Sequence, residues 1–224
     1  MDKLINSPAE VLKHVDIKPI EKECLDRVFK YLTAKDTKKQ EQWRKHISMM
    51  DLANTLMFLG LKPTRNQIKL MIWEVDDDLD GYVSEDEFMT MYKRCISDKT
   101  DLEPRGLFNL VQFLMYDKTF KGRVTVEETL QILFVRYGRD RLDDEIKAIF
   151  GDEEKNPDGS DKEIRFGEYV EKINLRALAM QQDYLKKKLD AIKAPVEDES
   201  DWETFIFKFK NIFLEIFRGF GVLG

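Results

Sequence analysis

Apolar residues recur along the first half of the chain at the three- and four-residue spacing of amphipathic helices. The spacing predicts four short helices with apolar faces made of Cys24, Val28, Phe29, Tyr31 and Leu32; Leu52, Leu56, Met57 and Leu59; Ile68, Met71, Ile72 and Val75; and Phe88, Met91, Tyr92 and Cys95. Gly60 is suited to end the second helix, and Thr64 with Gln67 forms a capping box that begins the third. This half therefore predicts two helix–loop–helix units.

The second half repeats the pattern after the polar segment 97–104. Its apolar spacing makes it look like a diverged copy of the first half, again with two helix–loop–helix units. We therefore expect an all-α protein with two lobes of paired units. Its predicted parts are an N-terminal extension at 1–19, lobes at 20–97 and 104–176, a helical extension at 177–193, a linker at 194–199 and a last helix at 200–224.

The last predicted helix, 200–224, carries an unusually aromatic face. Charged residues on its opposite stripe argue against a membrane span, which needs about 20 nearly uncharged residues. An apolar face of this kind must be covered, and three alternatives are open: the protein's own lobe, a partner protein, or a membrane surface. The final GxGxxG at 219–224 has no helix after it to hold a pyrophosphate, so no nucleotide site is predicted there.

The composition allows a sizeable core, since 42% of the 224 residues are hydrophobic and 36% are charged. A net charge of −6 argues against nucleic-acid binding by counterion release. Cys24 and Cys95 lie far apart and outside any CxxC pair, so we expect packing residues in a reducing compartment. No apolar signal segment follows Met1, which makes the cytoplasm the expected location.

A twelve-residue acidic loop, 76–87, lies between the third and fourth predicted helices. Oxygen ligands for a metal fall at positions one, three, five, seven, nine and twelve, contributed by Asp76, Asp78, Asp80, the backbone carbonyl of Tyr82, Ser84 through water, and Glu87. Gly81 at position six permits the positive φ of the sharp turn. Carboxylates crowded in this way repel one another unless a hard divalent cation lies among them, so Ca²⁺ is the expected cofactor.

Every position of this loop matches the EF-hand pattern, and the chain resembles the EF-hand superfamily over about residues 20–176. Its four-unit layout is similar to that of calmodulin and troponin C. The resemblance implies that the six loop residues named above bind calcium. The layout is also similar to that of EF-hand light subunits of cytoskeletal assemblies, including the axonemal dynein-docking machinery of cilia.

The first and third units depart from the pattern and are expected to be metal-free. In the third, 117–128 keeps the frame of the loop, but Thr119 and Lys121 replace two carboxylates. In the first, lysines and Trp43 fill the loop. We expect its remaining role to be a short pairing of Ile47 with Val83 that braces the second loop, because one short strand alone is not stable.

The fourth unit has a loop about three residues too long for the pattern when counted back from Glu168. An acidic, solvated loop is the expectation. The alternative is that Glu154, Asn156, Asp158 and Glu168 converge on an ion. Three of the four hands are therefore predicted to be degenerate.

The acidity of the chain is concentrated in the intact loop, which holds seven acids and no base, so the remainder carries a net charge of about +1 by the same count. Six of the nine methionines also lie in the first half: Met49, Met50, Met57, Met71, Met89 and Met91. Two interpretations are equally open, a target-binding groove that calcium exposes and ordinary core filling.

We find no nucleophile–base arrangement, and His14 and His46 lack a second metal-ligating residue at ligand spacing, so an enzyme is not expected. The expected function is that of a calcium-binding regulatory or structural subunit of a larger, cytoskeletal or ciliary, assembly. A protein partner would bind a helix-binding groove or the 200–224 helix. The alternative is a free cytosolic sensor that binds an amphipathic target helix when calcium binds.

Overall fold

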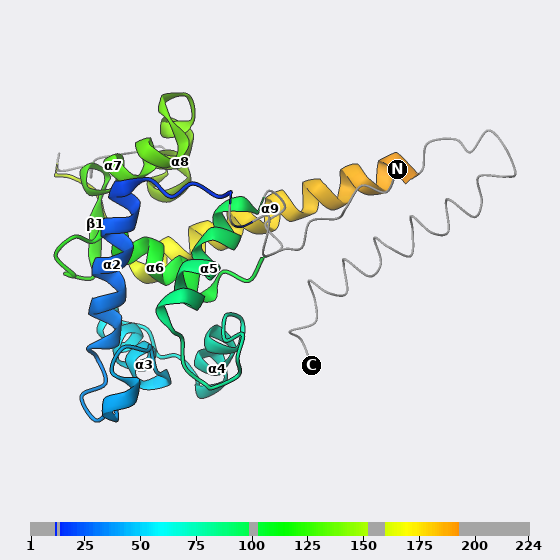
Figure 1. The fold of residues 1–224 in the computed structure, drawn as a ribbon. Coiled ribbons are helices and arrows are strands. Elements are labelled where there is room, and N and C mark those ends of the chain that lie inside the picture. Colours follow the sequence, from blue (N-terminus) through cyan, green and yellow to red (C-terminus); the bar gives the residue numbers. More distant parts are fainter. Residues whose placement is uncertain (1–11, 13, 99–102, 152–159, 193–224) are drawn as a thin grey trace, which may run out of the picture. The chain divides into compact units, whose positions relative to one another are not determined.

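The computed structural model describes residues 12, 14–98, 103–151 and 160–192 (Figure 1). Three features predicted from the sequence lie outside these residues: the linker 194–199, the last helix 200–224, and the fourth-loop residues Glu154, Asn156 and Asp158.

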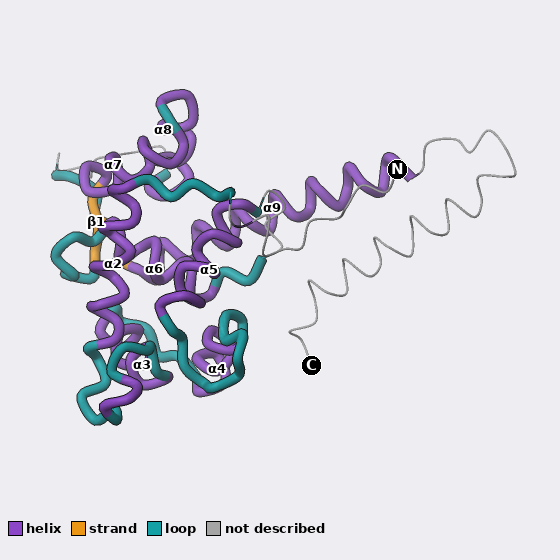
Figure 2. Tube along the Cα trace, in the orientation of Figure 1, coloured by secondary structure: helices purple, strands orange, loops and turns teal. Residues whose placement is uncertain are grey.

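The described residues are mainly helical, with one short pair of strands, which confirms the predicted all-α class (Figure 2). The elements in chain order are α2 (Pro19–Thr33), the 3₁₀ turn η1 (Glu41–Trp43), α3 (Met49–Phe58), α4 (Arg65–Trp73), α5 (Glu85–Ser97), α6 (Gly106–Tyr116), β1 (Arg123–Thr125), α7 (Val126–Tyr137), α8 (Arg139–Phe150), β2 (Glu163–Arg165) and α9 (Phe166–Ile192). No helix in the described part is long and apolar enough to cross a membrane.

The chain divides into two compact units, 1–98 with 103–174, and 99–102 with 175–224. All four helix–loop–helix units belong to the first, where one hydrophobic core runs through both pairs and includes the fully buried rings of Phe88, Phe113 and Tyr169. The described part of the second unit is the C-terminal portion of α9, which continues as a helix to Ile192. The domain limits proposed from the sequence stay a prediction.

Local signals set the ends of the helices that flank the loops. Gly60 has φ +85° just after α3, and the N–H of Leu61 donates to the Leu56 carbonyl at 2.9 Å. Glycine is favoured there because it adopts positive φ without a Cβ clash. Thr64 and Gln67 form the predicted capping box of α4. The turn chemistry expected from the sequence is therefore confirmed at both ends of this connection.

Short antiparallel pairings join the loops within each pair of hands. In the second pair, β1 and β2 pair with Val124 opposite Ile164. In the first pair, Ile47 and Val83 form an isolated bridge, with N···O distances of 2.9 and 3.0 Å in its two hydrogen bonds. Both residues are fully buried. The predicted pairing of Ile47 with Val83 is confirmed.

The side chain of Arg27 connects α2 of the first pair to the end of α6 in the second. Its Nη2 donates to the carbonyls of Leu114 and Met115 at 3.1 and 3.0 Å, and its Nη1 donates to those of Asp117 and Lys118 at 3.2 and 3.1 Å. The last carbonyls of a helix have no partner within the helix, and a guanidinium satisfies several at once. Arg27 thus acts as a C-terminal cap supplied by another helix.

We expect Arg27→Met to lower the free energy of unfolding by about 2 kcal/mol, because several carbonyl groups lose a charged donor while the apolar stem is kept. Arg27→Lys should lose less than the Met variant, since an ammonium reaches fewer of these carbonyls. Urea unfolding followed by circular dichroism measures both. A loss for Arg27→Met no larger than about 0.5 kcal/mol, the usual range for surface changes, would contradict this capping role.

Candidate metal centre

The acidic loop lies between α4 and α5 and is shaped by its own backbone. Leu79 and Gly81 have positive φ of +62° and +83°, which turn the chain back on itself. Gly81 tolerates this conformation without strain because it lacks a Cβ. The turn directs backbone N–H groups inward, where they meet the carboxylates of the same loop.

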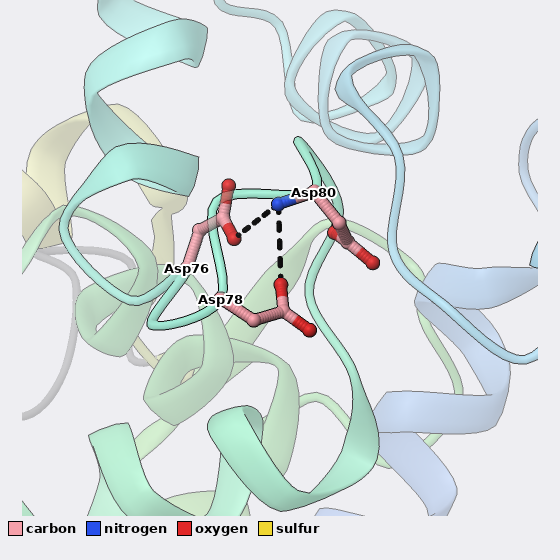
Figure 3. Close-up of side chains that lie close together, drawn as sticks. All are labelled: Asp76, Asp78 and Asp80. Carbon is pink, nitrogen blue, oxygen red and sulfur yellow. Dashed lines mark hydrogen bonds between the residues drawn. The ribbon is translucent and has the colours of Figure 1, made fainter.

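Three carboxylates converge in this loop (Figure 3). Ligand oxygens of Asp76, Asp78 and Asp80 lie within 4.8 Å of one another. The N–H of Asp80 donates to Oδ1 of both Asp76 and Asp78 at 3.1 Å, and the N–H of Gly81 donates to Oδ2 of Asp76 at 2.9 Å. Asp76 is buried, whereas Asp78 and Asp80 face solvent. Within the described ranges, this is the one acidic group of its kind.

Glu87 closes the loop from the first turn of α5. Its Oε2 accepts from the N–H and the hydroxyl of Ser84, both at 2.8 Å, and its Oε1 accepts from the N–H of Asp77 at 2.8 Å. Ser84 therefore caps the helix and orients the carboxylate at the same time. Glu87 is only 9% exposed, so both of its oxygens are held at the inner side of the loop.

Burial, neighbouring charges and hydrogen bonds shift the pKa values of two carboxylates in the loop, Asp76 and Glu87. Burial raises the pKa of Asp76 above its usual value, and the nearby Asp80 and Glu87 carboxylates add to the rise, although N–H groups of Gly81 and Asp80 oppose it. Burial would also raise the pKa of Glu87, but hydrogen bonds from Ser84 and Asp77 outweigh it and hold the pKa below its usual value. A divalent cation relieves this repulsion.

The residues present fit a hard cation with oxygen ligands. The structure brings three of the six predicted ligands together and places Glu87 at the end of the same loop, bonded to Ser84. The predicted roles of the Tyr82 carbonyl and of Ser84 through water stay predictions, as does the ligand set as a whole. When bound, calcium would supply the positive charge that the loop lacks.

Aromatic stacking links the first loop to the acidic loop, a contact not predicted from the sequence. The rings of Trp43, in the first loop, and Tyr82 stack with centroids 4.2 Å apart and an angle of 4° between their planes. The sequence pattern marks Trp43 only as a residue unable to bind metal. The sequence does carry a signal for this contact, because Trp43 lies four residues before the bridge-forming Ile47 and Tyr82 directly precedes the bridge-forming Val83.

The first loop holds an ammonium group in its interior. The side chain of Lys39 is 3% exposed, and its Nζ donates to the carbonyls of Thr33 at 2.9 Å and His46 at 2.6 Å. It also forms an ion pair with Asp51, whose side chain is fully buried. The lysines of this loop are evident in the sequence, but the enclosure of one of them is not.

The third loop keeps its frame, as predicted. Gly122 has φ +82°, and Asp117 accepts from the N–H groups of Lys121 and Gly122 at 3.0 and 2.6 Å. The ammonium of Lys121 lies 3.2 Å from Oε1 of Glu128 and 3.4 Å from Oε1 of Glu163. A cationic side chain therefore neutralises the carboxylate at the last position of this loop, which supports the expectation of a metal-free hand.

In the fourth unit, α8 ends at Phe150 as expected. Glu168 accepts from the N–H of Arg165 at 3.0 Å, so it caps α9. Its alternative role with Glu154, Asn156 and Asp158 stays untested, since those three residues lie outside the described part of the chain.

Two helices joined by an oxygen-rich loop with a glycine turn, and paired through a β-bridge to a second helix–loop–helix unit, define an EF-hand pair. The ion that this class of loop binds is Ca²⁺.

Comparison with known proteins agrees with this geometry. The EF-hand domain pair family matches residues 45–95. The "Probable calcium-binding protein CML27" of Arabidopsis thaliana is 27% identical over 132 residues, which are 59% of this chain and 71% of that protein. Calmodulin-like protein 6 of Oryza sativa subsp. japonica is 30% identical over 115 residues, which are 50% of this chain and 65% of that protein. By this match residues 45–95 form an EF-hand pair, and the chain as a whole is similar to calmodulin-like proteins.

Proposed function

We propose that this chain is a non-enzymatic calcium-binding protein with one strong site, at Asp76–Glu87, which serves as a regulatory or structural subunit of a larger assembly. One observation carries the single-site part. Among the described loops, the second brings ligand oxygens of three carboxylates within 4.8 Å of one another, whereas the first and third each direct a lysine ammonium at the acidic residue that ends the loop. A free calcium buffer would need every loop to bind.

Exposed apolar residues on α3 and α4 support a protein partner. Met50, Met57, Phe58, Leu70 and Trp73 are between 37% and 64% exposed. The methionines divide between the two roles left open by the sequence: Met91 belongs to the core, whereas Met50 and Met57 face solvent. Thioether chains adapt to different partner surfaces. The proposed partner surface is formed by these exposed residues or by the 200–224 helix.

The proposed location is the cytoplasm, and the proposed assembly is cytoskeletal or ciliary. The cytoplasm fits the free thiols Cys24 and Cys95. A cytoskeletal or ciliary assembly rests on layout alone, since the names of the two relatives refer to calcium and calmodulin only. The alternative function is a free sensor that binds an amphipathic helix on calcium binding, and the same exposed apolar residues favour it.

Calorimetric titration of the full chain with calcium tests the single-site proposal. We expect one strong site per chain, because only the second loop presents an uncompensated cluster of oxygens among the described residues. A second site of similar strength would overturn this part of the proposal and point to the fourth loop.

A hydrophobic dye distinguishes the subunit from the sensor. A fixed subunit should bind the dye equally with calcium and with chelator, whereas a sensor should bind more dye with calcium as its groove opens. Pull-down of native complexes with and without chelator then shows whether the partner stays bound in both conditions, as a fixed subunit requires.

A further inference from the structure

The enclosed ammonium of Lys39 occupies the place in the first loop that a metal ion takes in a working hand. Asp51 corresponds to Glu87: each is the third residue of its exit helix, each forms a capping box with a serine, and each lies four residues after its bridge residue, Ile47 or Val83. Lys39 therefore forms an ion pair with Asp51, the first-loop counterpart of Glu87, and Glu87 is proposed to bind calcium in the second loop.

The surroundings of this ammonium are those of a filled cation site. An ammonium has three N–H donors, and three oxygens accept from Lys39: the Thr33 and His46 carbonyls and the Asp51 carboxylate. With the Lys39 side chain 3% exposed and that of Asp51 fully buried, water cannot replace these contacts. Removing the lysine would leave a buried carboxylate unpaired, which is costly.

We propose that the Lys39 ammonium is the permanent internal cation of the first loop, and that Lys39 is a positioning residue which preforms the calcium site in the second loop. The proposal rests on the proposed function, since it assumes that calcium binds at Asp76–Glu87.

The contacts between the two loops are short and continuous. The His46 carbonyl that accepts from Lys39 belongs to the peptide whose N–H, that of Ile47, donates to Val83 at 2.9 Å. In return, the N–H of Val83 donates to the Ile47 carbonyl at 3.0 Å. That N–H belongs to the same peptide group as the Tyr82 carbonyl, the predicted ligand at position seven. Fixing the first loop therefore fixes the plane of a ligand peptide.

A second connection runs through the aromatic stack. The N–H of His46 donates to the Trp43 carbonyl at 2.9 Å, and the Trp43 ring stacks on Tyr82. The peptide on one side of His46 thus holds Trp43, and the peptide on the other side holds the bridge. The aromatic stack and the bridge therefore both act on Tyr82, whose carbonyl is the predicted ligand at position seven.

Lys121 shows that the arrangement is not confined to one loop. Its ammonium meets Glu128, the third residue of α7, four residues after the strand residue Val124. The Lys121 side chain is 31% exposed, so this cation is held less tightly than that of Lys39.

The test compares Lys39→Met with Lys38→Met in the full chain. Lys38 is the exposed neighbour, so its variant loses the same charge without touching the enclosed site. We expect Lys39→Met to weaken calcium binding about tenfold, a usual coupling between two sites, and Lys38→Met to leave it unchanged. Amide hydrogen exchange at Val83, measured with chelator, should become faster in Lys39→Met only.

Two outcomes would overturn the proposal: calcium affinity and Val83 exchange that are both unchanged in a folded Lys39→Met protein, or equal effects of the two variants. If Lys39→Met does not fold, Lys39→Met/Asp51→Asn removes the unpaired charge and keeps the helix cap. The proposal expects this double variant to bind calcium about tenfold more weakly, and wild-type affinity would contradict it.

Failure of the proposed function is recognised separately. A wild-type chain that binds no calcium at all would refute the calcium site, and the Val83 exchange rates in chelator would still decide whether Lys39 holds the first loop against the second.

Discussion

Replacing Glu87 with glutamine should abolish the strong calcium site, lowering affinity by about a hundredfold or more, or about 3 kcal/mol of binding free energy. Glu87 is the residue able to supply two oxygens to the ion, and its carboxylate is already held at the inner side of the loop by Ser84 and Asp77. An amide has one oxygen and no charge. Calorimetric titration with calcium measures the loss.

The variant should fold normally, which makes it a clean test. Glutamine serves as well as glutamate at the third position of a capping box, so the start of α5 is preserved. Asp86→Asn is the matched control, because Asp86 is an exposed neighbour outside the ligand set and its variant also loses one negative charge. Strong binding that survives in Glu87→Gln, or an equal loss in both variants, would refute the assignment of Glu87.

Replacing Arg136 with methionine should lower the free energy of unfolding by about 3–5 kcal/mol, the usual cost of leaving a buried carboxylate without its partner. Arg136 Nη2 lies 2.6 Å from Oε1 of Glu21, whose side chain is 1% exposed. Arg136 also donates to the Tyr92 hydroxyl at 2.9 Å, which donates to the same Glu21 oxygen at 3.1 Å. Burial raises the pKa of Tyr92 far above its usual value, so this hydroxyl keeps its proton.

Urea unfolding at neutral pH measures the effect, with Arg139→Met as the control. Arg139 is exposed at the start of α8, so its loss should change stability by about 0.5 kcal/mol or less. The triple contact joins α2, α5 and α7, and hence the first pair of hands to the second. Equal free energies of unfolding of the two variants would show that the Glu21–Arg136 ion pair does not stabilise the contact between the two pairs of hands.

Features with short-range signals were predictable from the sequence. Gly60 and the Thr64–Gln67 box mark helix ends because they act on their own backbone. The Ile47–Val83 bridge follows from the fixed spacing of an EF-hand loop, which places one residue of each loop at the pairing position. The convergence of Asp76, Asp78 and Asp80 follows from the same spacing.

Features that join distant residues were not predictable. Nothing in the sequence distinguishes the enclosed Lys39 from the exposed Lys38, because the choice depends on which of them reaches the carbonyl groups of Thr33 and His46 after folding. Arg27 and Arg136 likewise read as ordinary surface charges of amphipathic helices. Their partners lie in the other half of the chain, and periodicity within one helix carries no information about them.

An ion that is part of the chain cannot dissociate. On the proposed function, Lys39 and Lys121 hold their loops at any concentration of free calcium, so those loops would contribute nothing to the shape of a calcium response. With the one exchangeable ion of the proposed function, the occupancy would follow a simple hyperbola. Its Hill coefficient is one, and going from mostly empty to mostly full takes about two decades of calcium. The protein would then report calcium in a graded way, where a molecule with several coupled sites would respond steeply.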